Sequence, residues 1–243
     1  MRMLLMARRN AREILRDPIN LGFGLGFPII LLLLLTAIQA NVPVELFNLD
    51  KLTPGIAAFG LSFISLFTAV LVAKDRSSSL LQRLYTTPLT PLDFILGYGL
   101  PLIPMGFVQG IICYLAALIL GMEWTVHIFA ALLGLIPVTL LYVGIGLLCG
   151  SVMNDKQAGS ICGALLTNLS AWLSGTWFDL NLVGGAFRKV AYALPFVHGV
   201  DLGKALLAGA FTECWQDLLW VMGYAAVIWA AAVILFLRQM KRQ

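Results

Sequence analysis

The sequence predicts an all-α membrane protein with six transmembrane helices, and two observations lead to this prediction. Hydrophobic residues make up 60% of the 243-residue chain and charged residues only 12%, which is about half of the roughly 25% that is usual in soluble proteins. Apolar runs of about 20 residues, long enough to cross a hydrocarbon core of about 30 Å, recur along the whole chain. We therefore expect a single transmembrane domain over residues 1–243.

Residues 1–18 are predicted to form an amphipathic helix. On a helical wheel the apolar side chains gather within about a third of the circumference, and most of the rest is basic: Arg8, Arg9, Arg12 and Arg16. Such a helix lies along the membrane surface with its arginines among anionic headgroups. The alternative is a solvated, positively charged tail. A cleavable signal peptide is disfavoured because the leading segment is long and contains Glu13 and Asp17. Pro18 ends the helix.

Six apolar segments are predicted to cross the membrane: residues 19–39, 54–73, 94–120, 125–150, 157–175 and 216–237. The fifth is the least apolar, because Ser160, Asn168, Ser170 and Ser174 interrupt it. Polar groups are costly in lipid unless they face protein or water. We therefore expect the fifth span to lie inside the bundle or beside a pathway.

The distribution of Lys and Arg predicts the orientation. Twelve of the sixteen positive residues fall on one side of a six-span topology, and the positive-inside rule assigns that side to the cytoplasm. Both termini and residues 74–88 are therefore expected to be cytoplasmic in a multi-pass protein of the cell (inner or plasma) membrane. This bias accounts for the net charge of +4, so we expect no nucleic-acid partner.

Residues 176–212, between the last two spans, are expected to be helical. Two stretches in this segment carry apolar residues at helical spacing, and each is too short to cross a membrane. Pro195 and Gly199 divide them. Two interpretations remain open: a re-entrant pair of short helices that dips into the outer leaflet, and a helical hairpin that lies outside the membrane.

The sequence contains no motif that is typical of a catalytic site, a metal site or a phosphate-binding loop. His127 and His198 are far apart, the four cysteines lack metal-ligand spacing, and the only Gly-Lys pair, Gly203-Lys204, is not part of a phosphate-binding loop. We therefore expect no catalytic residue, no metal site and no cofactor bound by this chain. The spans are almost free of ionisable groups, which disfavours a proton-driven transporter and favours an energy source outside the bilayer.

The polar insert Lys74–Pro88, in the sequence KDRSSSLLQRLYTTP, is predicted to contain a short helix. Ser79 and Gln82 have the spacing of a capping box, and Pro88 closes the segment. The side chains that this helix offers to a partner are Leu80, Leu81, Arg83, Leu84 and Tyr85. Apolar side chains on a short cytoplasmic helix indicate docking of a partner protein. The alternative is a loop lying among headgroups.

These features together resemble the type-2 ATP-binding-cassette (ABC) permease family, the export-type membrane subunits of two-gene transporters. The resemblance covers essentially the whole chain. It rests on the amphipathic N-terminal helix, the six spans with both ends inside, and the quoted insert. It rests also on Ser174-Gly175, Pro195, Gly199 and Gly209 around the last two spans. Ser77-Ser78-Ser79 departs from the Gly-Thr of many relatives, although serine caps a helix equally well.

The resemblance implies a complex of two permease subunits, as a homodimer or a heterodimer, with two cytoplasmic ABC ATPases that bind ATP and Mg. Residues 74–88 would form the coupling helix that sits in a groove of the ATPase. The implied activity is export of an amphipathic compound, such as a drug, a peptide or a lipid-linked molecule, in the manner of multidrug exporters. The expected substrate pathway involves Asn168, Ser170, Trp172, Trp177 and Phe178.

Two other functions compete with export. A non-transporting membrane scaffold would use the same insert merely to recruit a cytoplasmic protein. A membrane-embedded enzyme acting on lipids ranks last, because the cytoplasmic face has no paired acid or histidine beyond Asp75 and Asp93.

Overall fold

The computed structural model describes residues 2–43, 47–78 and 90–240, and throughout these ranges the regular structure is helical. The first half contains α1 (Arg2–Leu15), α2 (Pro18–Leu21), the π-helix η1 (Gly22–Gly26), α3 (Phe27–Gln39), α4 (Leu49–Ser77) and α6 (Pro91–Ile119). The second half contains α7 (His127–Val152), α8 (Asp155–Ser160), the π-helix η2 (Ile161–Leu166), α9 (Thr167–Leu173), α10 (Leu180–Val183), α11 (Gly185–Ala193), α12 (Pro195–Leu207) and α13 (Cys214–Met240). The all-α prediction is confirmed.

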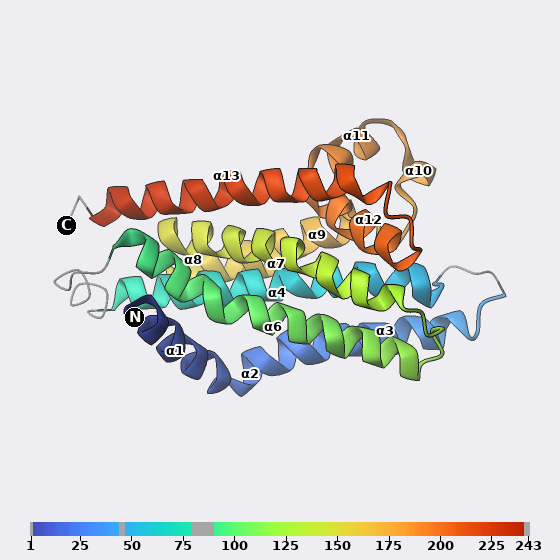
Figure 1. Ribbon diagram of the computed structural model, residues 1–243, viewed down its shortest axis with the longest axis horizontal. Helices are drawn as coiled ribbons and strands as arrows, with labels where there is room; N and C mark the ends of the chain where they lie inside the picture. The colour runs from blue at the N-terminus through green and yellow to red at the C-terminus, as the bar shows by residue number, and fades with distance from the viewer. Residues whose placement is uncertain (1, 44–46, 79–89, 241–243) are drawn as a thin grey trace.

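The long helices lie side by side as an up-and-down bundle (Figure 1). Helix α1 and the C-terminal end of α13 lie at one end of the bundle, which we call the α1 end. Helices α10, α11 and α12 gather at the other end, the α12 end (Figure 1). Five helices of the described chain are long and apolar enough to cross a membrane, and a sixth is counted if the bent pair α11–α12 is taken as one span.

The predicted fifth span, residues 157–175, forms the continuous helical stretch α8–η2–α9. It carries the chain from the α1 end toward the α12 end (Figure 1). Its polar residues keep it outside the set of five strongly apolar helices. Helix α13 returns from the α12 end to the α1 end, so the direction of this stretch agrees with the predicted topology, while its crossing of the membrane stays a prediction.

The segment between the last two spans is sharply bent between α11 and α12. Helices α11 and α12 meet at an angle of 81°, and the break falls at Leu194, directly before Pro195. Proline is favoured in the first turn of a helix and ends the preceding one. Gly199 does not divide the segment as the sequence suggested, because it lies within α12 and packs on Val138. Helix α12 is largely buried, whereas α11 is mostly exposed.

Helix α4 occupies the centre of the bundle. Of its most apolar stretch 89% is buried, compared with 17% in α13. Glycines of α7 allow this close packing: a Cβ atom at Gly146 would meet the backbone oxygen of Ser65, and one at Gly150 would lie 2.6 Å from the backbone oxygen of Ala69. Small residues of this kind let membrane helices approach each other closely.

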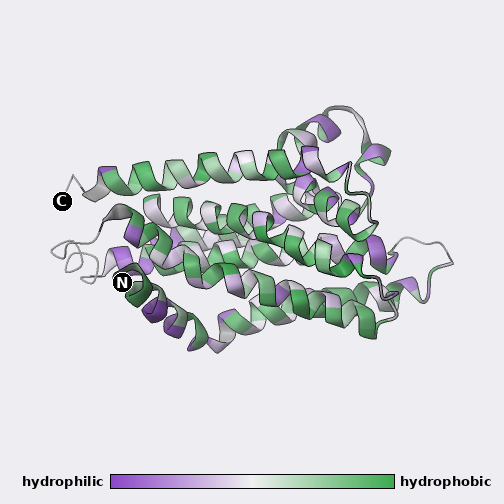
Figure 2. Cartoon of the chain, viewed as in Figure 1, coloured by the Kyte–Doolittle hydropathy of each residue, from purple (hydrophilic) through white to green (hydrophobic). Residues whose placement is uncertain are grey.

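The outer helices α3 and α13 expose apolar side chains along their lengths. Figure 2 shows hydrophobic residues along both helices, with the hydrophilic residues gathered mainly on α1 and at the α12 end. Exposed apolar surface is unfavourable in water and is expected where a helix faces lipid or another subunit. The bundle is therefore built as the membrane domain that the sequence predicted.

Candidate functional sites at the two ends of the bundle

Helix α1 packs sideways against α6. Met6 and Ala7 are buried, and a Cβ atom at Gly97 of α6 would lie 3.0 Å from the Met6 side chain. The buried Asn10 donates a hydrogen bond from its Nδ2 to the carbonyl oxygen of Gly97 at 3.0 Å. The protein-facing side of α1 therefore includes Met6, Ala7 and Asn10.

The predicted surface arginines of α1 do not share one environment. Arg9 points toward the bundle, where it pairs with Asp75 and, at 2.6 Å, with Glu13. Arg8, Arg12 and Arg16 are exposed, and at 100° per residue they fall with the exposed leucines of α1 within an arc of about 120°. These leucines are Leu4, Leu5 and Leu15. Helix α1 thus has one side for the protein and another that is both basic and apolar.

Asp75, in the last turn of α4, is buried with only 4% of its surface exposed. Its carboxylate accepts hydrogen bonds from both terminal nitrogens of Arg9, one of them at 3.0 Å, and from the Tyr98 hydroxyl at 2.8 Å. A buried carboxylate is tolerated when it is paired and hydrogen-bonded in this way. The hydrogen bond to Asp75 also raises the pKa of Arg9 above its ordinary value, so Arg9 keeps its positive charge.

Arg76, the next residue, reaches a different helix. Its guanidinium donates to the carbonyl oxygens of Ser151 and, at 2.7 Å, of Met153. These carbonyls belong to the C-terminal end of α7, where a cation is favoured by the helix dipole. We call Arg9, Asp75, Arg76 and Tyr98 the α4 clamp. It ties the end of α4 to α1, α6 and α7.

The α4 clamp stands directly before the predicted docking segment. Helix α4 ends at Ser77, and the docking residues Leu80, Leu81, Arg83, Leu84 and Tyr85 lie outside the described residues. After that segment Thr90 caps α6 through a reciprocal capping box with Asp93. The end of α4 and the start of α6, which flank the segment, are therefore both held by side-chain hydrogen bonds. The carboxylate of Asp93 is hydrogen-bonded within this cap, and the carboxylate of Asp75 is hydrogen-bonded within the clamp.

A polar cavity of about 550 Å³ lies at the α12 end. Its walls come from the start of α4, the turn around Thr176, and helices α10, α11 and α12. Four charged residues of both signs line it: Lys51, Asp179, Asp201 and Lys204. Aromatic and apolar side chains complete the wall: Phe47, Leu52, Trp177, Phe178, Tyr192 and Val197. We call this space the α12-end cavity.

The structure brings part of the predicted substrate pathway together. Trp177 and Phe178 line the α12-end cavity, and Trp172 packs on Phe178 with ring centroids 6.1 Å apart. Ser170 is buried elsewhere, in a hydrogen bond with the hydroxyl of Tyr142. Asn168 is exposed and donates to the carbonyl oxygen of Ala164 at 2.8 Å. Neither Ser170 nor Asn168 is among the residues that line the cavity.

His198 joins α12 to α13 beside this cavity. It is only 4% exposed, its Nδ1 lies 2.6 Å from Asp217, and its Nε2 lies 3.0 Å from the carbonyl oxygen of Tyr192. The ring also stacks on Trp220, with centroids 5.0 Å apart. These contacts fit the structural role that a lone histidine usually has.

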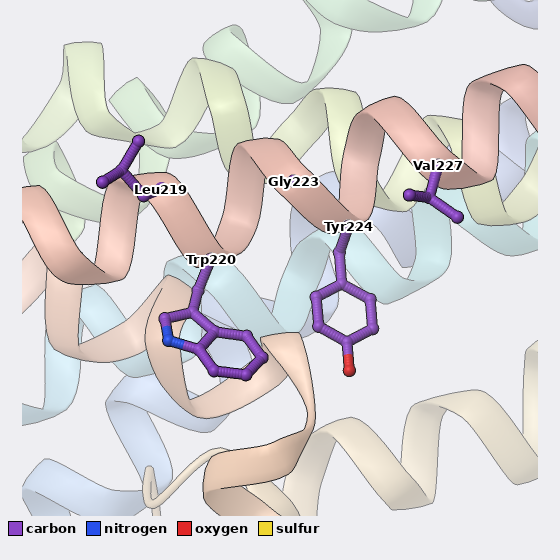
Figure 3. A pocket seen from close by; sticks show the side chains of 5 residues that line it. All are labelled: Leu219, Trp220, Gly223, Tyr224 and Val227. Carbon is purple, nitrogen blue, oxygen red and sulfur yellow. The ribbon is translucent and has the colours of Figure 1, made fainter.

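Trp220 also lines a shallow groove of about 450 Å³ on the surface of α13 (Figure 3). The groove is lined by Leu219, Trp220, Gly223, Tyr224 and Val227, and Figure 3 shows the Trp220 and Tyr224 rings side by side on one face of the helix. Aromatic rings with a polar atom at one edge are typical of the boundary between lipid and water. The groove therefore belongs to the exposed apolar face of α13.

Sequence reasoning missed Tyr98 and the cavity lysines. Tyr98 lies in an apolar run without any local signal, and Lys51 and Lys204 are 153 positions apart in the chain. The one available signal was Asp75, an acid at the end of an apolar span, where a buried charge needs a partner.

Comparison with known protein families gives a match over most of the chain. A family model with the description ABC-2 type transporter matches residues 1–207, from α1 to the end of α12. No match was found among curated proteins.

Proposed function

Because the chain belongs to the ABC-2 type transporter family, we propose that it is the membrane subunit of an ATP-driven exporter of amphipathic compounds. In this proposal two cytoplasmic ABC ATPases bind ATP and Mg, and a second permease, either another copy of this chain or a sister chain, completes the assembly. The α1 end faces the cytoplasm, as the distribution of Lys and Arg favours.

The observation that carries the proposal is the α4 clamp. The predicted docking segment follows α4 directly, and the clamp joins the last turn of α4 to α1, α6 and α7 through Asp75 and Arg76. A force that ATPase closure applies to the end of α4 would therefore reach three other helices through these side-chain contacts. A scaffold that only recruits a partner has no need of such a connection.

The α12-end cavity supports an exit for the substrate on the opposite side. It combines charged residues with Trp177 and Phe178, which suits a compound with one polar and one apolar part. The mostly exposed α11 and the buried α12 would form its outer boundary.

The test is reconstitution with an ABC ATPase encoded beside this chain. The purified complex in proteoliposomes should hydrolyse ATP, and a fluorescent amphiphile should move across the bilayer only with ATP present. A Walker-lysine variant of the ATPase provides the matched control. If the ATPase associates stably but never hydrolyses ATP and no substrate moves, the scaffold function is correct and the exporter proposal is wrong.

The basic side of α1 leads to a prediction about lipid dependence. Changing Arg8, Arg12 and Arg16 to glutamine should weaken the attraction to anionic headgroups by about 1 kcal/mol per arginine. Export in proteoliposomes should then lose its dependence on the fraction of anionic lipid. The control is the conservative change of the same residues to lysine, which keeps the charge and should keep the dependence. An unchanged lipid dependence in the glutamine variant would favour the solvated-tail interpretation of residues 1–18.

A further inference from the structure

The four charges of the α12-end cavity come from three separate parts of the chain. Lys51 lies in the first turn of α4, Asp179 precedes α10, and Asp201 and Lys204 lie one turn apart in α12. Because two of these side chains are positive and two are negative, the net charge of the cavity lining is zero. A ligand with a single charge would therefore meet repulsion as well as attraction in this space.

Lys204 and Asp201 keep hydrogen-bonding capacity toward the cavity. The Lys204 ammonium has three donors, and it makes one hydrogen bond, to the carbonyl oxygen of Gly175 at 3.2 Å, and a long ion pair with Asp201 at 3.9 Å. The Asp201 carboxylate accepts one weak hydrogen bond from Tyr192 at 3.3 Å. About 30% of each side chain is exposed, so a ligand in the cavity can reach both.

The carboxylate of Asp179 accepts more hydrogen bonds within the protein than the carboxylate of Asp201 does. Its Oδ1 caps α10 and accepts hydrogen bonds from the backbone and side-chain nitrogens of Asn181, both at 2.8 Å. Lys51 is exposed at the rim of the cavity. Lys204 and Asp201 are therefore the pair that a bound ligand would engage most directly, and Lys51 and Asp179 would add longer-range attraction.

We propose that the α12-end cavity binds amphipathic compounds with a zwitterionic headgroup. The anionic group of the ligand lies toward Lys204 and Lys51, its cationic group lies toward Asp201 and Asp179, and its apolar part lies against Trp177 and Val197. This proposal names the class of compound that the proposed exporter would carry. That the bound compound is exported rests on the proposed function. Binding itself needs this chain alone.

The test compares three probes with the same hexyl chain and different headgroups. Hexylphosphocholine is zwitterionic, hexyltrimethylammonium is cationic and hexyl sulfate is anionic. Their binding to the purified full chain in dodecyl maltoside is measured by calorimetry, without an ATPase. The zwitterion should bind about two to five times more tightly than either ion, as expected for one partly exposed charge contact.

Single-charge variants give the decisive result. Lys204→Met should weaken binding of the zwitterion and strengthen binding of the cation, whereas Asp201→Asn should weaken the zwitterion and strengthen the anion. Lys51→Met, at the exposed rim, should act like Lys204→Met with a smaller change, so the test remains valid if a change in α12 harms folding. The matched controls Lys189→Met and Glu213→Gln remove exposed charges outside the cavity lining and should change nothing.

Two outcomes would overturn the proposal: no saturable binding of any probe, or variants of opposite charge that shift the three affinities in the same direction. Either result leaves the exporter function intact, because that function is tested by ATP-dependent transport with the ATPase present. Conversely, a chain that never pairs with an ATPase could still show the charge-dependent binding described here.

Discussion

Replacing Leu81 and Leu84 by aspartate is expected to abolish association with the ATPase and all export. In a helix that starts at Ser79, Leu80, Leu81, Leu84 and Tyr85 fall on one side, and the proposed function places that side in a groove of the ATPase. Losing two buried leucines costs about 4 kcal/mol, which is about a thousandfold in affinity. Burying two carboxylates adds to this loss.

The measurement is copurification of a tagged ATPase with the variant permease, combined with transport in proteoliposomes. The matched control is Gln82→Asp with Thr86→Asp, which adds the same charge on the opposite side of the predicted helix and should leave the complex intact. The permease itself should keep its thermal stability in both variants, since the insert is predicted to lie in the cytoplasm, outside the helical bundle. Copurification at the wild-type level with the leucine variant would disprove docking through this face.

The sequence was sufficient for the architecture because membrane helices are defined by local composition. A run of apolar residues can satisfy its own backbone hydrogen bonds only as a helix, so the number and order of spans could be predicted without tertiary information. The stretch predicted as the fifth and least apolar span is helical and is not among the five strongly apolar helices. The break before Pro195 could also be predicted, because proline restricts the residue that precedes it, whereas Gly199 was misassigned because glycine serves close packing within helices as well as breaks.

The two sites could be predicted only in part, because they depend on tertiary contacts. Amphipathicity indicated that α1 would lie at a surface, but the wheel could not indicate that Arg9 turns inward, since its partner Asp75 lies 66 positions away. The α12-end cavity joins α4, α10, α11 and α12, and no local pattern relates Lys51 to Lys204. Two of the predicted pathway residues, Trp177 and Phe178, line this cavity, and their role in a substrate pathway stays a prediction.

Arg9→Gln is expected to destabilise the α1 end and to uncouple the subunit. The substitution leaves Asp75 buried with the Tyr98 hydroxyl and without a cationic partner. Breaking a fully buried ion pair costs about 3 to 5 kcal/mol, and we expect about 2 kcal/mol here, because 39% of the Arg9 side chain is exposed. With the link from α4 to α1 removed, ATP hydrolysis by the assembled complex should continue while export falls.

A double-mutant cycle separates this coupling role from a simple loss of stability. Asp75→Asn alone should leave Arg9 without its buried partner, and the double variant Arg9→Gln with Asp75→Asn should recover part of the thermal stability, because two neutral amides replace an unpaired charge. Export should stay low in the double variant, since the charged link is still missing. Arg8→Gln, at the adjacent exposed position, is the control and should change neither quantity in lipid without anionic headgroups.

The export of the double variant decides between two roles of the clamp. If export recovers together with stability, the α4 clamp holds the fold but does not transmit the movement of the ATPase. If export stays low at restored stability, the Arg9–Asp75 pair is part of the path from the docking segment to the transmembrane helices.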